Sequence, residues 1–256
     1  MQGFFFRNPE HGSKGLVWLA GPGNTSLKYL RYGRVLLGDG EKVCIDTGSE
    51  EYAVVVLSGK AVVETEGGEF EAVKHSAVYI PKDSSFRIQG CGGGLDAAVF
   101  AAEAVRKYSP FFADIREILG RPEKHKVVGD ENSKREVITL IGQDVEADRL
   151  LVGVTWTMKG NWSSWPPHEH GDLLEEIYVF YDMDRRAFGI QMVYEDFEEP
   201  MFIGLVRNGD CVVIPRGFHP NVAAPGFELK YVWAMCALEP VKYRVYGKMR
   251  VQEGYG

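Results

Sequence analysis

Three of the six histidines of this chain fall in two short motifs whose spacing suits a metal ion. His168 and His170 form the first motif, and His219 belongs to the second. Side chains at positions i and i+2 of a β-strand point to the same face, so His168 and His170 are expected to project together. Imidazole nitrogens with a carboxylate oxygen suit a divalent metal. We expect zinc, with manganese, iron or nickel as alternatives. If the motifs bind no metal, these residues are ordinary surface or hydrogen-bonded core histidines.

A carboxylate for the same site comes from the pair Glu175-Glu176, at the entry of an apolar run. Neighbours on a strand face opposite ways, so only one of the two can join the histidines. We favour Glu176, because it would share a face with Tyr178 and Phe180, and Glu175 is the alternative. The predicted metal ligands are His168, His170, Glu176 and His219.

Prolines and glycines beside the two motifs are suited to position the histidines. Pro166-Pro167 keep the backbone extended before His168. Pro215 ends a strand, and Gly217 permits the tight turn that brings His219 inward. Both motifs are therefore expected at the ends of β-strands.

The composition of the 256 residues, 45% hydrophobic and 25% charged, is that of a globular protein. A net charge of -7 argues against binding to nucleic acid or to anionic membranes. The chain has no apolar run of about twenty residues and no signal-peptide pattern at its start. Its four cysteines are scattered without a CxxC pair, so we expect a reducing cytoplasm. A homodimer is the default expectation for assembly.

Short β-rich runs separated by turn residues predict an all-β protein of two tandem sandwiches or small barrels. Ile80-Pro81 and Ile214-Pro215 end similar runs in the two halves, which indicates a weak internal duplication. Residues 1–24 are expected to be an irregular arm. The predicted domains are 1–102, a connector at 103–135 with a helical turn near 112–119, and 136–256, in which 243–251 adds a last strand.

The motifs resemble those of a known family. Residues 160–168, Ile177-Tyr178 and the two stretches 215–220 and 222–227 resemble the 5-deoxy-glucuronate isomerase family of myo-inositol catabolism, within the cupin superfamily. Residues 176–184 are similar to the related 5-keto 4-deoxyuronate isomerases of pectin breakdown. This resemblance implies a bicupin, with two double-stranded β-helix (jelly-roll) barrels in tandem.

The N-terminal half resembles a second cupin copy that lacks the ligands. No His-x-His motif precedes Glu50-Glu51, where only Cys44 and Asp46 could act as ligands. No histidine follows Pro81 closely, where only Asp83 could. The first domain is therefore expected to bind no metal and to serve packing, an interface or a lid.

The resemblance implies an aldose–ketose isomerisation of a deoxy sugar acid, most directly 5-deoxy-glucuronate to 2-deoxy-5-keto-gluconate. Such a reaction needs a general base, for which the candidates are Glu175, Glu169, Tyr178 and Tyr194. Its anionic substrate needs a cation, for which Arg216 is the first candidate and Arg135, Arg186 and Lys230 are weaker ones. Trp162, Trp165 and Trp233 either line the site or fill the core. The predicted catalytic residues are Glu175, Tyr178 and Arg216.

Two other function classes remain open at this point. An iron-dependent dioxygenase uses a similar ligand set, and oxygen uptake would identify it. A non-catalytic sugar-acid-binding protein would hold its ligand unchanged over hours.

Overall fold

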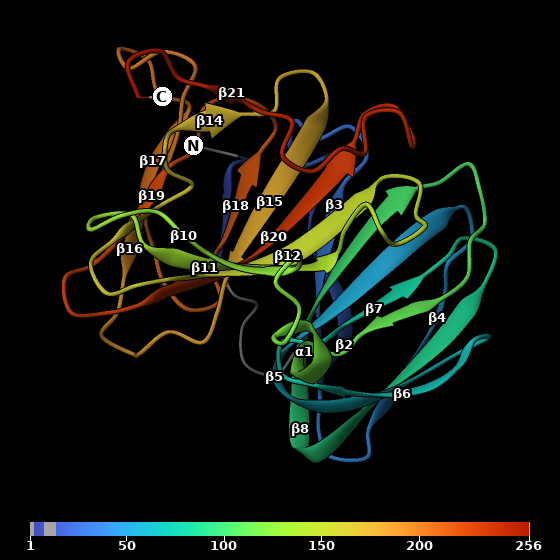
Figure 1. Ribbon diagram of the computed structural model, residues 1–256. Coiled ribbons are helices and arrows are strands. Elements are labelled where there is room, and N and C mark those ends of the chain that lie inside the picture. Colours follow the sequence, from blue (N-terminus) through green and yellow to red (C-terminus); the bar gives the residue numbers. More distant parts are fainter. Residues whose placement is uncertain (1–2, 8–13, 256) are drawn as a thin grey trace.

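The computed structural model describes residues 3–7 and 14–255, which form two β-rich modules lying side by side (Figure 1). Nearly all regular structure is β-strand, so the all-β prediction is confirmed. The sheets of the modules are open and do not close into barrels. None of the helices in the described part is long and apolar enough to cross a membrane.

The N-terminal module is built on one eight-stranded sheet. Its main path is β2-β3-β8-β5-β7-β9, with β4 beside β8 and β6 beside β5. The strands are β2 (Gly15–Ala20), β3 (Arg31–Leu37), β4 (Lys42–Asp46), β5 (Glu50–Thr65), β6 (Gly68–Val73), β7 (Ala77–Ile80), β8 (Ser85–Glu103) and β9 (Phe111–Ala113).

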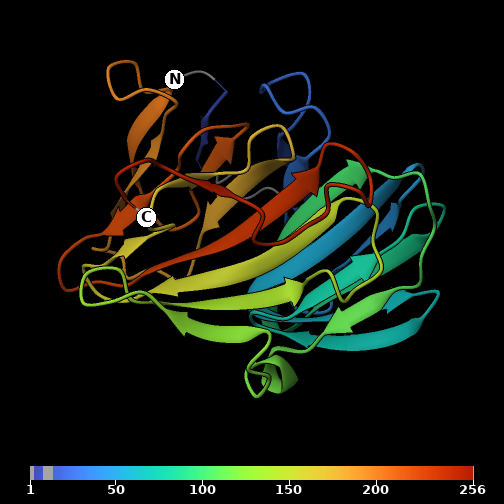
Figure 2. The same cartoon turned by 45° about the horizontal axis from the view of Figure 1, so that its top comes forward.

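The C-terminal module combines a seven-stranded sheet, in the order β1-β18-β15-β20-β12-β11-β10, with two smaller sheets. The large sheet contains β1 (Phe5–Phe6), β10 (His125–Val128), β11 (Arg135–Ile141), β12 (Leu150–Thr157), β15 (Leu174–Phe180), β18 (Cys211–Ile214) and β20 (Leu229–Ala237). The smaller sheets contain β13 (Trp162–Ser163), β16 (Gly189–Val193), β17 (Phe202–Val206) and β19 (Asn221–Ala223), and the pair β14 (His168–Glu169) and β21 (Arg250–Val251). The turned view of Figure 2 shows the long strands of the two large sheets running beside one another.

The central strands are buried on both faces, because side chains alternate between two cores. On β15, Ile177 and Val179 belong to a core shared with the N-terminal module. Tyr178 and Phe180 belong to the separate interior of the C-terminal module. This alternation explains why the strand reads as one continuous apolar run, and it decides which way each glutamate of the neighbouring pair points.

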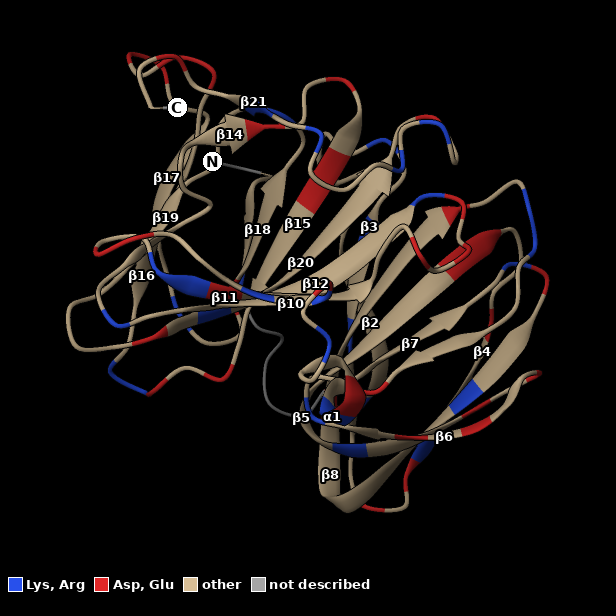
Figure 3. Cartoon of the chain, in the orientation of Figure 1, with Lys and Arg blue, Asp and Glu red and all other residues tan. Residues whose placement is uncertain are grey.

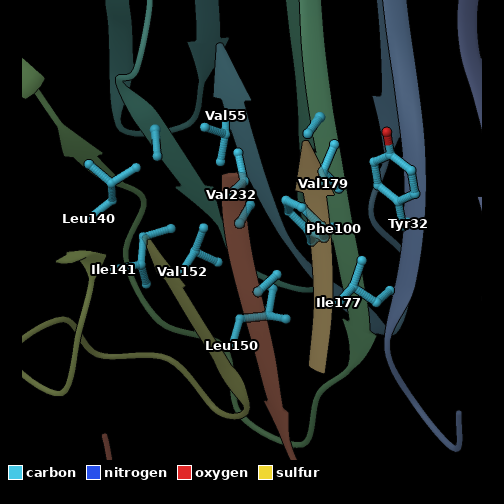
Figure 4. Close-up of a cluster of buried hydrophobic side chains, with 14 of the residues drawn as sticks. Tyr32, Val55, Phe100, Leu140, Ile141, Leu150, Val152, Ile177, Val179 and Val232 are labelled. Atoms are coloured by element: carbon cyan, nitrogen blue, oxygen red, sulfur yellow. The ribbon is translucent and has the colours of Figure 1, made fainter. Parts of the chain in front are cut away.

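The shared core joins the modules along their large sheets. Figure 4 shows Val55 and Phe100 of the N-terminal module among Val152, Val179 and Val232 of the C-terminal one. All of these side chains are buried. The two modules are thus packed through their hydrophobic faces and are not connected by a flexible linker alone.

Two segments differ from the sequence-based expectation. Residues 1–24 contain β1 and β2 instead of an irregular arm alone, and β1 pairs with β18 of the other module. The expected connector 103–135 is divided between the sheets, because β9 pairs with β7 and β10 pairs with β11. Between them lies the short helix α1 (Ile115–Ile118). Sheet extension supplies hydrogen-bond partners to backbone groups that packed segments would otherwise bury unpaired.

Candidate metal centre

The four predicted ligand side chains converge in the C-terminal module. His168 and His170 lie on and directly after β14, and His219 lies in the turn after β18. The ligand nitrogens of these histidines lie within 4.8 Å of one another. On β15, Glu176 places its Oε2 atom 3.4 Å from His170 Nε2 and 3.2 Å from His219 Nε2. Segments far apart in the sequence therefore form one compact cluster of nitrogen and oxygen atoms.

Backbone carbonyls orient the three imidazoles. The Nδ1 atoms of His168, His170 and His219 lie 3.0, 3.4 and 2.9 Å from carbonyl oxygens. An Nδ1–H that donates to a carbonyl leaves Nε2 with its lone pair free, which is the usual arrangement of a histidine that binds a metal. The carbonyls belong to Pro166, Lys248 and Gly217, respectively.

Gly217 is required for the turn that delivers His219. Its φ is 90°, and an added Cβ would lie 2.7 Å from the carbonyl oxygen of Tyr194. Tyr194 and Phe218 exchange backbone hydrogen bonds of 3.0 and 2.8 Å across this turn. A larger residue at position 217 would therefore displace the backbone that carries His219.

The chemistry of the donor set fits a divalent cation. Glu176 Oε2 and His219 Nε2 are buried and have no hydrogen-bond partner within the described residues. Burial raises the pKa of Glu176, but the His170 and His219 imidazoles beside it outweigh burial and lower it. Burial also lowers the pKa of His168 to about 3, which keeps that imidazole neutral and able to bind a metal. A cation would satisfy the unpartnered atoms, and these four residues could hold it.

A cavity of about 310 Å³ opens beside the cluster. This volume suits a small molecule. Its walls are mostly aromatic and aliphatic, with polar and charged side chains among them. The lining residues include Lys126, Arg135, Ser164, Trp165, His168, His170, Glu176, Tyr178, Tyr231, Trp233 and Tyr246.

Tyr178 lies between the ligand cluster and a buried chain of hydroxyl groups. Its OH is 2.7 Å from Ser164 Oγ, and Ser164 Oγ is 3.3 Å from Tyr231 OH. The Tyr231 OH is in turn 2.7 Å from Ser163 Oγ. Burial raises the pKa of Tyr178 well above its usual range, so its hydroxyl stays protonated at neutral pH. The arrangement therefore places a protonated hydroxyl, hydrogen-bonded to Ser164, beside the His219 ring.

Two of the predicted catalytic residues lie elsewhere. Glu175 points to the opposite face of β15, where its carboxylate accepts hydrogen bonds from backbone N–H groups of residues 28–30. Arg216 is exposed, and its Nε donates to Glu195 at 2.9 Å. Neither side chain lines the cavity beside the histidines. The expectations that Glu175 is the general base and that Arg216 binds the substrate carboxylate are therefore corrected.

The remaining candidates also divide into residues that line the cavity and residues that do not. Glu169 pairs with Arg250, and the Tyr194 OH donates to Gln252, so neither points into the cavity. Of the weaker cation candidates, Arg135 lines the cavity, whereas Arg186 pairs with Asp184 and Lys230 with Asp182. Trp165 and Trp233 line the cavity, and Trp162 packs on Trp165 with ring centroids 5.1 Å apart.

Lys126 is a cavity residue that sequence reasoning missed. No motif surrounds it, and the signal that could have found it is weak. The alternation Lys126-Val127-Val128 predicts a strand on which Lys126 and Val128 share a face, and both line the cavity.

The N-terminal module has a hydrophobic interior where the C-terminal module has its cluster. Val54, Val56 and Ile80 fill it, together with Tyr52, which packs against Phe86 with ring centroids 5.5 Å apart. Among the residues that the structure describes, the group of side chains that could hold a metal ion is His168, His170 and His219.

Comparison with known proteins agrees with the family resemblance of the sequence motifs. The KduI/IolB family model matches residues 5–252. A 5-deoxy-glucuronate isomerase of Geobacillus thermodenitrificans is 28% identical over 252 residues, covering 92% of this chain and 90% of the relative. Another of that name from Lacticaseibacillus casei is 33% identical over 201 residues, covering 72% and 73%.

Solved structures agree on the fold. An IolB-like protein from Salmonella typhimurium superposes with a TM-score of 0.84 at 22% identity, covering 99% of this chain and 98% of that one. An oxalate decarboxylase of Bacillus subtilis superposes with a TM-score of 0.64 at 11% identity, covering 92% and 77%. The two modules thus have the bicupin fold expected from the sequence. With its family model matched over nearly its whole length, this chain belongs to the KduI/IolB family.

Proposed function

We propose that this chain is a metal-dependent isomerase that converts an aldose to a ketose in a deoxy sugar acid, namely 5-deoxy-glucuronate to 2-deoxy-5-keto-gluconate. The observation that carries the proposal is the cluster of His168, His170, Glu176 and His219 beside a small-molecule cavity. Relatives with the name 5-deoxy-glucuronate isomerase align over most of their length, which selects this chemistry among the reactions of the fold.

The cluster would hold one divalent cation, for which we propose zinc, with manganese, iron and nickel as the other candidates. When bound, such an ion supplies Lewis-acid polarisation of a carbonyl group and stabilises negative charge on oxygen. Neutral imidazoles and one carboxylate leave a net positive charge on the loaded site. That charge favours an anionic substrate.

The residues of the chain supply a route for the proton that moves between the oxygens, in a cavity with largely apolar walls. Isomerisation moves one proton between adjacent carbons and one between their oxygens, with no net oxidation. The protonated hydroxyl of Tyr178 can give a proton to a substrate oxygen and recover one through Ser164. Trp165, Trp233 and Tyr246 wall the cavity and limit the access of water.

Elemental analysis followed by an anaerobic NMR time course tests the proposal. The purified protein should contain about one equivalent of a divalent metal and convert 5-deoxy-glucuronate to the ketose. Activity should disappear on chelation and return when the metal is restored. Conversion of 5-keto 4-deoxyuronate instead would move the assignment to that related substrate. Oxygen uptake with bound iron, or substrate unchanged over hours with the metal in place, would reject the proposal.

A further inference from the structure

The basic residues that line the cavity come from one hairpin, β10–β11, and none of them follows from the ligand motifs. We propose that Arg135 and Lys126 bind the carboxylate of the substrate and make this hairpin the determinant of specificity for acidic over neutral sugars. The inference rests on the proposed function, because it names the residues that recognise the acid group at that site.

The register of the hairpin turns both cations to the same side. Lys126 pairs with Val137, and Arg135 pairs with Val128. All four of these side chains line the cavity. Facing residues of an antiparallel pair share one face of the sheet, so the two cations project from that face on neighbouring strands. Two donors placed in this way can contact both oxygens of one carboxylate.

The same face continues to the metal cluster. Val137 pairs with Thr155 on β12, and Thr155 pairs with Tyr231 on β20. From β20 the face reaches β15, where Met235 pairs with Glu176. Thr155, Tyr231, Met235 and Glu176 all line the cavity. One sheet therefore carries the cations at its β10–β11 edge and the Glu176 carboxylate on the inner strand β15, and all three side chains line the same cavity.

Neither cation has a carboxylate partner within residues 3–7 and 14–255. Arg135 donates instead to two backbone carbonyls, at 2.8 Å from Nη1 and 2.6 Å from Nη2. Lys126 is exposed and forms no ion pair in that part of the chain. Figure 3 shows basic residues on β10 and β11 and acidic residues on β15. Charged side chains on folded proteins are commonly paired when partly buried, so an unpaired guanidinium at a cavity wall indicates an anionic ligand.

The charge balance of the cavity also favours an anionic ligand. Glu176 is the acidic residue among its lining side chains, and it lies against His170 and His219. The cavity therefore has an excess of positive charge in a chain whose net charge is -7. A guanidinium held by two hydrogen bonds is the better planar partner for a carboxylate, and the exposed Lys126 ammonium adds attraction. Arg135 is thus assigned the directed contact.

The test compares an acidic and a neutral sugar of the same size on the metal-loaded protein. Calorimetric titration with D-glucuronate and with D-glucose is carried out on the wild type, Arg135→Gln, Lys126→Gln and the control Arg186→Gln. Arg186 is exposed and paired with Asp184, outside the cavity. We expect Arg135→Gln to weaken D-glucuronate binding about 10- to 100-fold and Lys126→Gln a few-fold, with D-glucose binding and metal content unchanged.

Arg135 also contacts the Trp165 carbonyl, so a merely structural role is the main alternative. A structural role would weaken both sugars equally in Arg135→Gln and leave Lys126→Gln like the wild type, and that result overturns the inference. Undetectable binding of D-glucuronate to the wild type also overturns it. Because Lys126 is exposed, its variant keeps the test valid if Arg135→Gln fails to fold.

Steady-state kinetics distinguish a failure of the carboxylate-recognition inference from a failure of the proposed isomerase function. With 5-deoxy-glucuronate, Arg135→Gln should raise KM about 10- to 100-fold, as for D-glucuronate binding, while kcat stays near that of the wild type. If the wild type isomerises this substrate and KM does not change in Arg135→Gln, the proposed function stands and the inference fails. If D-glucuronate binding depends on Arg135 but no isomerisation occurs, carboxylate recognition stands and the proposed reaction fails.

Discussion

The carboxylates of Glu51 and Glu175 occupy equivalent places in the two modules, and each binds three consecutive backbone N–H groups of the other module. Glu51 accepts from residues 148–150, at 2.7 to 2.8 Å. Glu175 accepts from residues 28–30, at 2.6 to 2.8 Å. Each glutamate thus fixes the chain just before a central strand of the opposite sheet, β12 in one case and β3 in the other.

The equivalence follows from strand register. Tyr52, next to Glu51, pairs with Ile80, and Glu176, next to Glu175, pairs with Ile214. Both isoleucines precede a proline. Tyr52 therefore stands in the N-terminal module where Glu176 stands in the C-terminal one. Both modules have the buried glutamate, whereas among the described residues the cluster of histidines with a carboxylate lies in the C-terminal module alone.

Replacing Glu175 with alanine should destabilise the protein by about 2–4 kcal/mol, because three backbone donors lose their charged acceptor. The metal content should remain that of the wild type, since Glu175 faces away from the histidines. Chemical denaturation and elemental analysis measure the two quantities. The exposed Glu239, which pairs with Lys242, provides the control Glu239→Ala, with an expected loss below about 1 kcal/mol. Loss of metal in Glu175→Ala at unchanged stability would instead make Glu175 a ligand.

His168→Ala and His219→Ala should each lose most of the bound metal while keeping the β-sheet signal in circular dichroism. Each removes one neutral nitrogen from the cluster, and a divalent ion binds far more weakly to the ligands that remain. His125→Ala is the matched control, because His125 contacts Glu136 outside the cluster. Stoichiometric metal in the double variant His168→Ala/His219→Ala contradicts the site assignment.

Tyr178→Phe should lower kcat by about 10²- to 10⁴-fold with metal content unchanged, because it removes a protonated hydroxyl that lines the cavity beside His219. Steady-state kinetics on 5-deoxy-glucuronate measure the effect. The control is Tyr194→Phe, whose hydroxyl donates to Gln252 away from the cavity. A kcat within a few-fold of the wild type in Tyr178→Phe would exclude the proton-transfer role.

The convergence of the four predicted side chains could be anticipated because it depends on local geometry. Two histidines at i and i+2 share a face of an extended strand wherever that strand lies, and the turn residues around His219 limit its direction. The choice of Glu176 over Glu175 depended on a shared face with Tyr178. The structure places Glu176 and Tyr178 in one interior and Ile177 in the other core, as strand alternation requires.

The cations could not be predicted in this way. Arg216 is close to His219 in sequence, but the turn after β18 directs it to solvent and Glu195. Arg135 and Lys126 reach the cavity only because β10 and β11 extend the same sheet, and sheet order is set by long-range pairing. The cavity also depends on Gly153, where an added Cβ would lie 2.1 Å from the Trp233 ring. Such contacts have no signature in a single sequence.

His75 lies in a turn of the N-terminal module and contacts the C-terminal one. Its Nδ1 is 2.8 Å from the Tyr181 hydroxyl, and its ring lies 5.0 Å from that of Trp156. Burial lowers the pKa of His75 from 6.5 to about 4, with a further decrease from Lys74 and Lys230 against the opposing effect of Asp182. The unfolded chain therefore binds a proton at higher pH than the folded one.

The contribution of neutral His75 to stability is thus fully present above pH 6.5 and is lost as the pH falls toward 4. Because the ring is only partly buried, we expect a loss of about 1–2 kcal/mol over that range. His75→Asn should have a flatter dependence of the free energy of unfolding on pH between these values, since asparagine tolerates the positive φ of 73° at this position and does not titrate. Denaturation at a series of pH values measures both slopes. Parallel curves for the wild type and His75→Asn would show that the contact between the modules does not depend on the protonation of this residue.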